Sequence, residues 1–172
     1  MRRYFLPVII IFLFVFESLA IDFFPLHSLH EDWIIAPRFV LIALIFITIY
    51  GGLYFGIVYS LVFGFLIDIV YTGIMGIYIF SFTLVAYGAF LLMRIIHNHA
   101  LVAVFAAVIS VVFVEYTAYN IHSIIGSTRM MHDQFLYTRL LPTLLFNATA
   151  AIILIYPLKK FLNNLVLEMN EE

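Results

Sequence analysis

Residues 51–68 read GGLYFGIVYSLVFGFLID, and this stretch decides how the rest of the chain is expected to fold. It is apolar enough to lie in lipid, yet small or polar residues recur at every fourth position. They are Gly52, Gly56, Ser60, Gly64 and Asp68. Positions four apart share one face of a helix, and small residues there let a second helix come close in a bilayer. Since lipid tolerates a carboxylate poorly, we predict that this helix is the packing centre of a bundle, with Asp68 facing inward.

The composition indicates an integral membrane protein. Of 172 residues, 66% are hydrophobic and only 10% are charged, and the mean hydropathy is +1.16. A soluble domain is about half apolar and about a quarter charged. No polar segment is long enough for an aqueous catalytic domain, so residues 1–172 are expected to form a single transmembrane domain. The absence of cysteine excludes disulfides and thiolate chemistry, and without a basic run no nucleic-acid partner is expected.

Six apolar segments approach or reach the roughly 17–25 residues that a membrane-spanning helix needs. The predicted spans cover residues 4–24, 36–50, 53–69, 74–93, 100–124 and 140–158. The expected fold is therefore an all-α six-transmembrane-helix bundle. Because the second segment is short, a five-span arrangement with a re-entrant second segment is the alternative. The run Ser18-Leu19-Ala20 also resembles a signal-peptide cleavage site, but the apolar character continues beyond it.

Lysine and arginine near helix ends are retained on the cytoplasmic side and set the orientation. With six spans, one side holds Arg2, Arg3, Arg94, Lys159 and Lys160, and the other holds Arg38, Arg129 and Arg139. Both termini are therefore expected to be cytoplasmic. The tail at residues 159–172 carries apolar side chains at helical spacing. It is expected to form either an amphipathic helix on the inner membrane face or a frayed extension of the last span.

Five charged residues are expected at one depth in the membrane. Counting about 1.5 Å per residue from the cytoplasmic boundaries places Glu17, Asp68 and Glu115 roughly 21–22 Å along their helices, in the outer third of a core of about 30 Å. Arg38 and Arg139 begin the two helices that descend from the outer side, near the same level. Each unpaired charge costs about 2.5–3.5 kcal/mol at the bilayer centre. We therefore predict that the two arginines turn inward and pair with the three acids, leaving one carboxylate over.

That remaining carboxylate is expected to be protonated, bonded to a hydroxyl or amide, or open to outside water. Asn147 joins the layer because it follows Arg139 and Thr143 at intervals of four residues. Such groups either hold helices together or line an outward-facing pocket or a partner's docking groove. No catalytic residue, cofactor or metal site is predicted. One polar cluster in the first outer loop matches no known metal spacing. It consists of His27, His30, Glu31 and Asp32.

Several short motifs occur in order along nearly the whole chain. They are Phe16-Glu17-Ser18 in the first span, Pro37-Arg38-Phe39 opening the second, Gly64-Phe65-Leu66-Ile67-Asp68 in the third, Glu115 in the fifth, and Arg139-Leu140-Leu141-Pro142-Thr143 with Asn147 in the sixth. Together they resemble the MreD family of bacterial rod-shape-determining membrane proteins. The resemblance implies that certain residues are core or pocket residues, and it implies no catalytic residue. These are Glu17, Arg38, Asp68, Glu115, Arg139 and Asn147.

The resemblance implies a non-enzymatic part in the elongation complex (the elongasome) that builds the lateral peptidoglycan cell wall at the bacterial cell membrane. The implied partners are MreC, the MreB filament, the polymerase RodA and an elongation-specific transpeptidase, together with membrane lipid. Members of this family also look similar to the substrate-binding subunits of energy-coupling-factor transporters, which are six-helix bundles with an outward-facing pocket. Two other functions stay open. One is a transporter subunit that binds a small molecule or lipid near Arg38, Arg139 and Asn147; the other is an intramembrane enzyme that uses Asp68 or Glu115.

Overall fold

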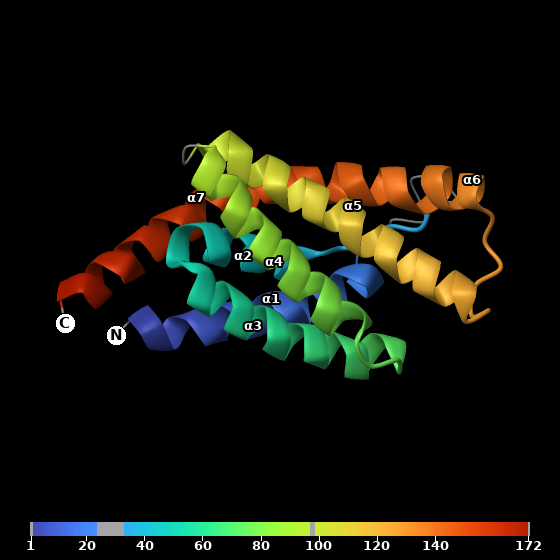
Figure 1. Cartoon of the computed structure of the whole chain (residues 1–172), viewed down its shortest axis with the longest axis horizontal. Coiled ribbons are helices and arrows are strands. Elements are labelled where there is room, and N and C mark those ends of the chain that lie inside the picture. Colours follow the sequence, from blue (N-terminus) through green and yellow to red (C-terminus); the bar gives the residue numbers. More distant parts are fainter. Residues whose placement is uncertain (1, 24–32, 97–98, 172) are drawn as a thin grey trace.

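The computed structural model describes residues 2–23, 33–96 and 99–171, and every regular element in these ranges is helical (Figure 1). The α-helices are α1 (Arg2–Phe23), α2 (Phe39–Phe46), α3 (Leu53–Ile67), α4 (Ile77–Ile95), α5 (Ala100–Ile124), α6 (His132–Gln134) and α7 (Leu141–Glu171). The π-helical segments are η2 (Ile47–Gly51), η3 (Asp68–Thr72) and η4 (Phe135–Leu140). The segments η2 and η3 continue α2 and α3, and η4 leads into α7. The predicted all-α class is confirmed.

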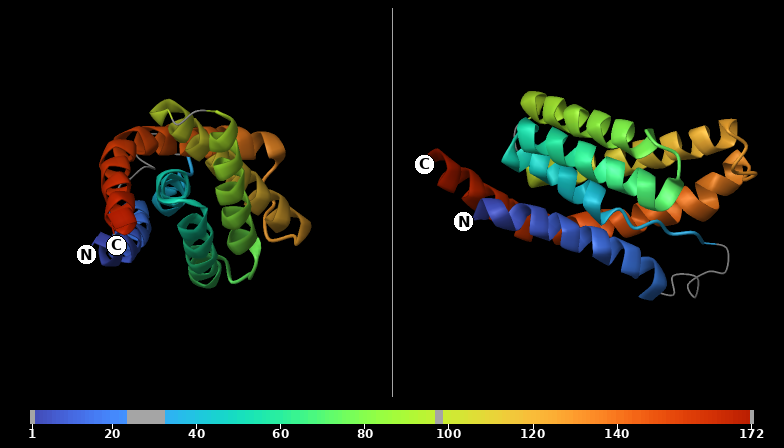
Figure 2. Two further views of the ribbon diagram at one scale, coloured as in Figure 1. Left: turned by 60° about the vertical axis from the view of Figure 1, so that its left-hand side comes forward. Right: turned by 90° about the horizontal axis from the view of Figure 1, so that it is seen from below.

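Within the described residues, four helical stretches are long and apolar enough to cross a membrane. They are Leu53–Thr72, Ile77–Ile95, Ala100–Ile124 and His132–Met169. Two shorter apolar helices, Phe5–Ala20 and Phe39–Gly51, correspond to the first and second expected spans. That all six cross the membrane stays a prediction. The start of α1 and the end of α7 lie at the same end of the bundle (Figures 1 and 2), as an even number of crossings requires.

The packing centre of the bundle is α2, and the prediction that the helix within residues 51–68 would occupy it is wrong. All residues of α2, Phe39–Phe46, are buried. Figure 2 shows the longer helices arranged around it. In contrast, α3 exposes large apolar side chains on its outer face, including Tyr54, Val62 and Phe65. The sequence of α2 is apolar on every side, which suits a helix surrounded by protein.

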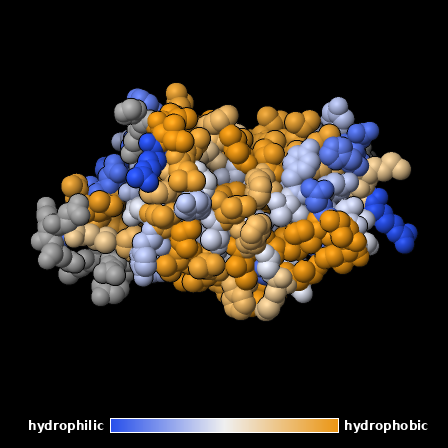
Figure 3. All heavy atoms as spheres, viewed as in Figure 1, coloured by the Kyte–Doolittle hydropathy of each residue, from blue (hydrophilic) through white to orange (hydrophobic). Residues whose placement is uncertain are grey.

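The outer surface is largely apolar. Figure 3 shows hydrophobic residues across the middle of one face and hydrophilic residues toward both ends of the molecule. Large apolar side chains are exposed on α1, α4, α5 and α7, for example Phe12, Phe80, Phe105 and Ile153. Monomeric soluble proteins rarely expose contiguous apolar surface on this scale, so hydrocarbon is the solvent that this surface fits.

The row of small residues on α3 meets two neighbours in turn. A methyl group at Gly56 would lie 2.1 Å from the Oγ1 atom of Thr48 in η2. A methyl group at Gly64 would lie 2.8 Å from the Cα atom of Ile79 in α4. Ser60, between the two glycines, is buried. A repeat of four residues turns by about 40° per step around a helix, so the row passes from η2 at one end to α4 at the other.

Gly52, the first residue of that row, serves the turn between η2 and α3. Its φ of 99° is a conformation that residues with a side chain rarely adopt. Among the described residues, nothing lies within 4 Å of the position that a Cβ atom would occupy. This glycine therefore lets the chain reverse direction and makes no close helix contact of its own.

The last helix continues past residue 158, where the last span was expected to end. The helix α7 runs from Leu141 to Glu171, with Pro157 inside it. Its tail packs through Leu158, Leu162 and Leu165, which are all buried. Their spacing of four and three residues places them on one face of the helix. The tail is thus a packed extension of the last span.

Candidate functional site

A non-helical stretch at residues 33–38, here called the entry segment, leads into the central helix and carries backbone groups that need partners. Irregular backbone at membrane depth is tolerated only where the protein or a water-filled cavity supplies those partners. The N–H of Ile34 donates to the carbonyl of Thr138 in η4 at 2.8 Å. The Oγ1 atom of Thr143 accepts from the N–H of Ala36 at 3.1 Å and donates to the carbonyl of Ile34 at 3.4 Å. The first half of the entry segment is thus held by η4 and α7.

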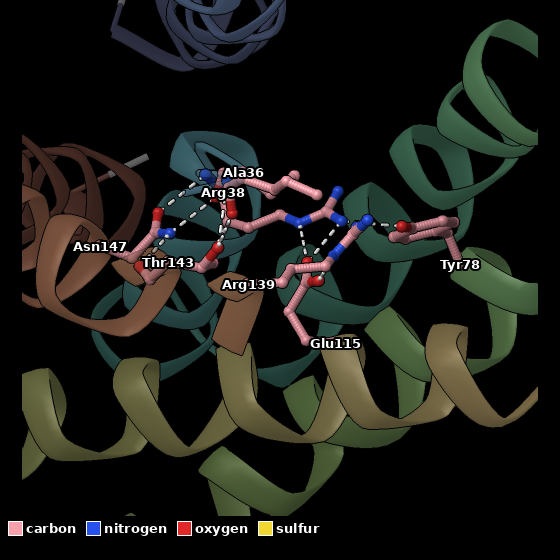
Figure 4. Close-up of polar contacts among 8 residues, drawn as sticks. Ala36, Arg38, Tyr78, Glu115, Arg139, Thr143 and Asn147 are labelled. Atoms are coloured by element: carbon pink, nitrogen blue, oxygen red, sulfur yellow. Dashed lines mark hydrogen bonds and ion pairs between the residues drawn. The ribbon is translucent and has the colours of Figure 1, made fainter. Parts of the chain in front are cut away.

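Asn147 and Glu17 hold the second half. The side chain of Asn147 accepts from the N–H of Arg38 and donates to the carbonyl of Ala36, both at 2.8 Å (Figure 4). The Oε2 atom of Glu17 in α1 accepts from the N–H of Val40, in the first turn of α2, at 2.9 Å. Both side chains are buried. Polar residues of α1 and α7 therefore fix the place where the chain enters the central helix.

Replacing Asn147 with leucine is expected to lower the free energy of unfolding by at least about 1–3 kcal/mol, because two backbone groups lose their partner in a buried position. Thermal unfolding of the purified protein in detergent measures the change. Asn163→Leu is the matched control, since Asn163 lies on the same helix and is exposed. If both variants unfold at the wild-type temperature, Asn147 does not hold the entry segment.

Arg38, Glu115 and Arg139 form a charged cluster beside the entry segment. Arg38 donates to Oε1 of Glu115 through Nε at 2.8 Å and through Nη2 at 2.6 Å. Arg139 donates to Oε2 through Nε at 3.0 Å. Figure 4 shows the two guanidinium groups meeting at this carboxylate, with Tyr78 beyond them. The side chain of Glu115 is 0% exposed, so its charge is balanced entirely inside the protein.

Asp68 caps the beginning of α4. Its carboxylate accepts from the N–H groups of Gly76 and Tyr78 at 2.9 Å and from that of Ile79 at 3.2 Å. The first N–H groups of a helix have no partner within the helix, and a negative charge is favoured there. The acid thus joins the end of α3 to the start of α4 across the intervening turn.

This pairing differs from the predicted one, in which the two arginines were shared among three acids. Both arginines meet Glu115, whereas Glu17 and Asp68 accept hydrogen bonds from backbone amides. Asp68 connects to the charged cluster through Tyr78, whose hydroxyl accepts a hydrogen bond from Nη2 of Arg38 at 2.8 Å. Two carboxylates, not one, are therefore left to backbone partners.

Tyr78 is the site residue that sequence reasoning missed. It joins Asp68 to Arg38, and no spacing marks it, because it lies across a turn from Asp68 and on another helix from Arg38. The sequence spacing did place Thr143 on one helix face with Arg139 and Asn147, but it did not predict the bonds of Thr143 to backbone groups of the entry segment.

Two small cavities adjoin the charged cluster and share Tyr78, His122 and Arg139 as lining residues. One has a volume of about 160 Å³. The other, of about 230 Å³, is also lined by Glu17 and Arg38. Sites for whole small molecules measure about 300–1,000 Å³. Each cavity is therefore suited to a single polar group.

The hydrogen bonding of Glu115 and Asp68 favours a structural role for these two acids. A general base needs an oxygen within reach of a substrate proton. Both oxygens of Glu115 accept from arginine, and both oxygens of Asp68 accept from amides. In the parts of the chain that the structure describes, no three metal-ligating side chains come together. The polar cluster at residues 27–32 lies outside the described residues.

Comparison with known proteins identifies the family. The profile of the family described as rod shape-determining protein MreD matches residues 1–165. A protein of Bacillus subtilis (strain 168), also described as rod shape-determining protein MreD, is 33% identical over 172 residues, which is 100% of this chain and 100% of that protein. No solved structure matches the chain, so the likeness to transporter subunits stays a prediction. With its apolar helices and this match along the whole sequence, the chain belongs to the MreD family of multi-pass membrane proteins of the rod-shape-determining system.

Proposed function

We propose that this protein is a non-enzymatic membrane component of the elongation complex, which supports lateral peptidoglycan synthesis and cell shape by docking MreC. Its further partners would be MreB, RodA and the elongation-specific transpeptidase. The observation that carries the proposal is family membership combined with buried acids that are already occupied by arginines and backbone amides. The polar residues support a rigid bundle that presents apolar surface to lipid and to partner helices.

Both termini are proposed to be cytoplasmic. The start of α1 and the end of α7 lie at one end of the bundle (Figure 1). Arg94 and Lys159 belong to the side that the distribution of basic residues assigns to the cytoplasm. The charged cluster and its cavities then lie in the outer half of the membrane.

Depletion of the protein from a rod-shaped bacterium is expected to round the cells, and the tagged protein is expected to copurify with MreC. Light microscopy and affinity purification in detergent measure the two results. A tagged membrane protein of similar size from outside the complex is the control for nonspecific capture. Unchanged cell shape together with no recovery of MreC would refute the proposal.

The alternative, a transporter subunit, has less support. Each cavity beside Arg139 is smaller than the about 300 Å³ at which sites for whole small molecules begin. The ion pair between Arg38 and Glu115 also uses groups that such a ligand would need. Thermal stabilisation of the purified protein by a vitamin-sized ligand would restore this alternative.

A further inference from the structure

We propose that the cavity of about 160 Å³ beside Arg139 binds a phosphate group, carried either by a lipid headgroup or by a free phosphorylated ligand. This cavity lies between the end of α5, the loop that follows it, and η4. Nothing in the docking of MreC requires such a site, so the two proposals stand or fall separately.

The first support is the unused hydrogen-bonding capacity of Arg139. Its Nε atom donates to Glu115, and within the described residues no hydrogen bond occupies its terminal amino groups. The side chain is 33% exposed and lines the cavity. A guanidinium group offers several donors in a planar fork that matches the oxygens of phosphate. Arg139 thus places hydrogen-bond donors for a phosphate group at the wall of an accessible cavity.

The second support is the balance of charge. Glu115 supplies one negative charge to two guanidinium groups, and the further carboxylate beside Arg38, that of Glu17, does not line this cavity. Glu17 lines the larger cavity and opposes an anion there. The cavity of about 160 Å³ has no acidic lining residue, which makes it the better place for an anion.

The third support is a set of further donors around the same cavity. The Oγ1 atom of Thr128 accepts from the N–H of Met130 at 3.3 Å, which leaves the hydroxyl hydrogen of Thr128 free to donate. His122, at the end of α5, lines both cavities and offers a ring N–H. Tyr119 donates to the carbonyl of Met130 at 3.0 Å and holds this loop against α5. Arginine, histidine and threonine therefore line one cavity, and its volume suits one tetrahedral group.

The test uses the purified full-length protein in a nonionic detergent. In one arm, thermal unfolding is followed while inorganic phosphate is added at constant ionic strength. In the other arm, native mass spectrometry counts the phosphatidylglycerol molecules retained by each chain. Both arms compare wild type with Arg139→Gln and Thr128→Val. Arg129→Gln is the matched control, because it removes the same charge from an exposed position in the loop that carries Thr128.

We expect wild type and Arg129→Gln to bind the probe, and Arg139→Gln and Thr128→Val to bind it at least about tenfold more weakly. Binding of inorganic phosphate indicates a free phosphorylated ligand, and retention of phosphatidylglycerol alone indicates a lipid headgroup. Thr128→Val leaves all the ion pairs intact, so it decides the question if Arg139→Gln does not fold. Failure of wild type in both arms, or equal binding by wild type and a folded cavity variant, would overturn the proposal.

Discussion

Glu115→Gln is expected to lower the free energy of unfolding by about 3–5 kcal/mol, the largest effect of any single change proposed for this chain. The carboxylate is fully buried and is the shared ion-pair partner of Arg38 and Arg139. Glutamine has nearly the same shape, but it leaves two guanidinium groups facing each other without an anion between them. Domains have net stabilities of about 5–15 kcal/mol, so a loss of this size removes a large part of the folded population.

Asp133→Asn is the control for Glu115→Gln, because it removes one carboxylate from the exposed surface of α6. Changes at such surface positions are usually within about 0.5 kcal/mol of wild type. The measurement is the unfolding temperature in detergent, together with the amount of folded protein recovered from membranes. If Glu115→Gln were as stable as Asp133→Asn, the charged cluster would not hold the bundle together.

Gly64→Ala is expected to destabilise the protein by about 1–3 kcal/mol, the usual cost of overpacking a tight contact. The added methyl group would lie 2.8 Å from both Cα of Ile79 and the carbonyl oxygen of Tyr78. Carbon atoms pack best at about 3.5–4.0 Å, and these neighbours are backbone atoms that cannot rotate away. Moving α4 outward would also stretch the bonds from the N–H groups of Tyr78 and Ile79 to Asp68.

Gly88→Ala provides the matched control on the helix that Gly64 contacts. Among the described residues, nothing lies within 4 Å of the position of its Cβ atom. Alanine is favoured over glycine inside helices by about 1 kcal/mol, so this variant should be as stable as wild type or more stable. Comparison of the two unfolding temperatures isolates the effect of close packing. Equal temperatures would mean that α3 and α4 can separate at no cost.

Much of the fold could be predicted because hydrophobic length is the main determinant of membrane helices. The expected segment at residues 100–124 coincides with α5. The end of α7 could not be predicted, because the apolar stretch ends at Lys159. The helix continues to Glu171, since Leu162 and Leu165 are buried against the bundle. The entry segment was also missed, since its apolar residues read as the start of a span.

Several of the residues singled out from the sequence lie close together in the structure, but their hydrogen bonds and ion pairs could not be predicted. Counting residues along each helix gives depth, and the structure does bring Glu17, Arg38 and Arg139 to the lining of one cavity. Depth says nothing about which helices are neighbours. The residue count therefore could not predict that Asp68 caps α4, or that Glu115 forms ion pairs with both arginines. The hydrogen-bond and ion-pair partners of these acids depend on which helices pack together, and residue spacing does not give that.

The central claim is that the buried polar residues maintain the bundle and perform no chemistry of their own. The most direct test expresses Glu115→Gln, Asn147→Leu and Gly64→Ala in cells depleted of the native protein, and compares cell shape with the amount of folded protein. The account predicts that cell shape depends only on the amount of folded protein. Each of the three variants should therefore restore rods when enough of it folds. A Glu115→Gln protein that folds to the wild-type level and binds MreC, yet leaves the cells round, would contradict it.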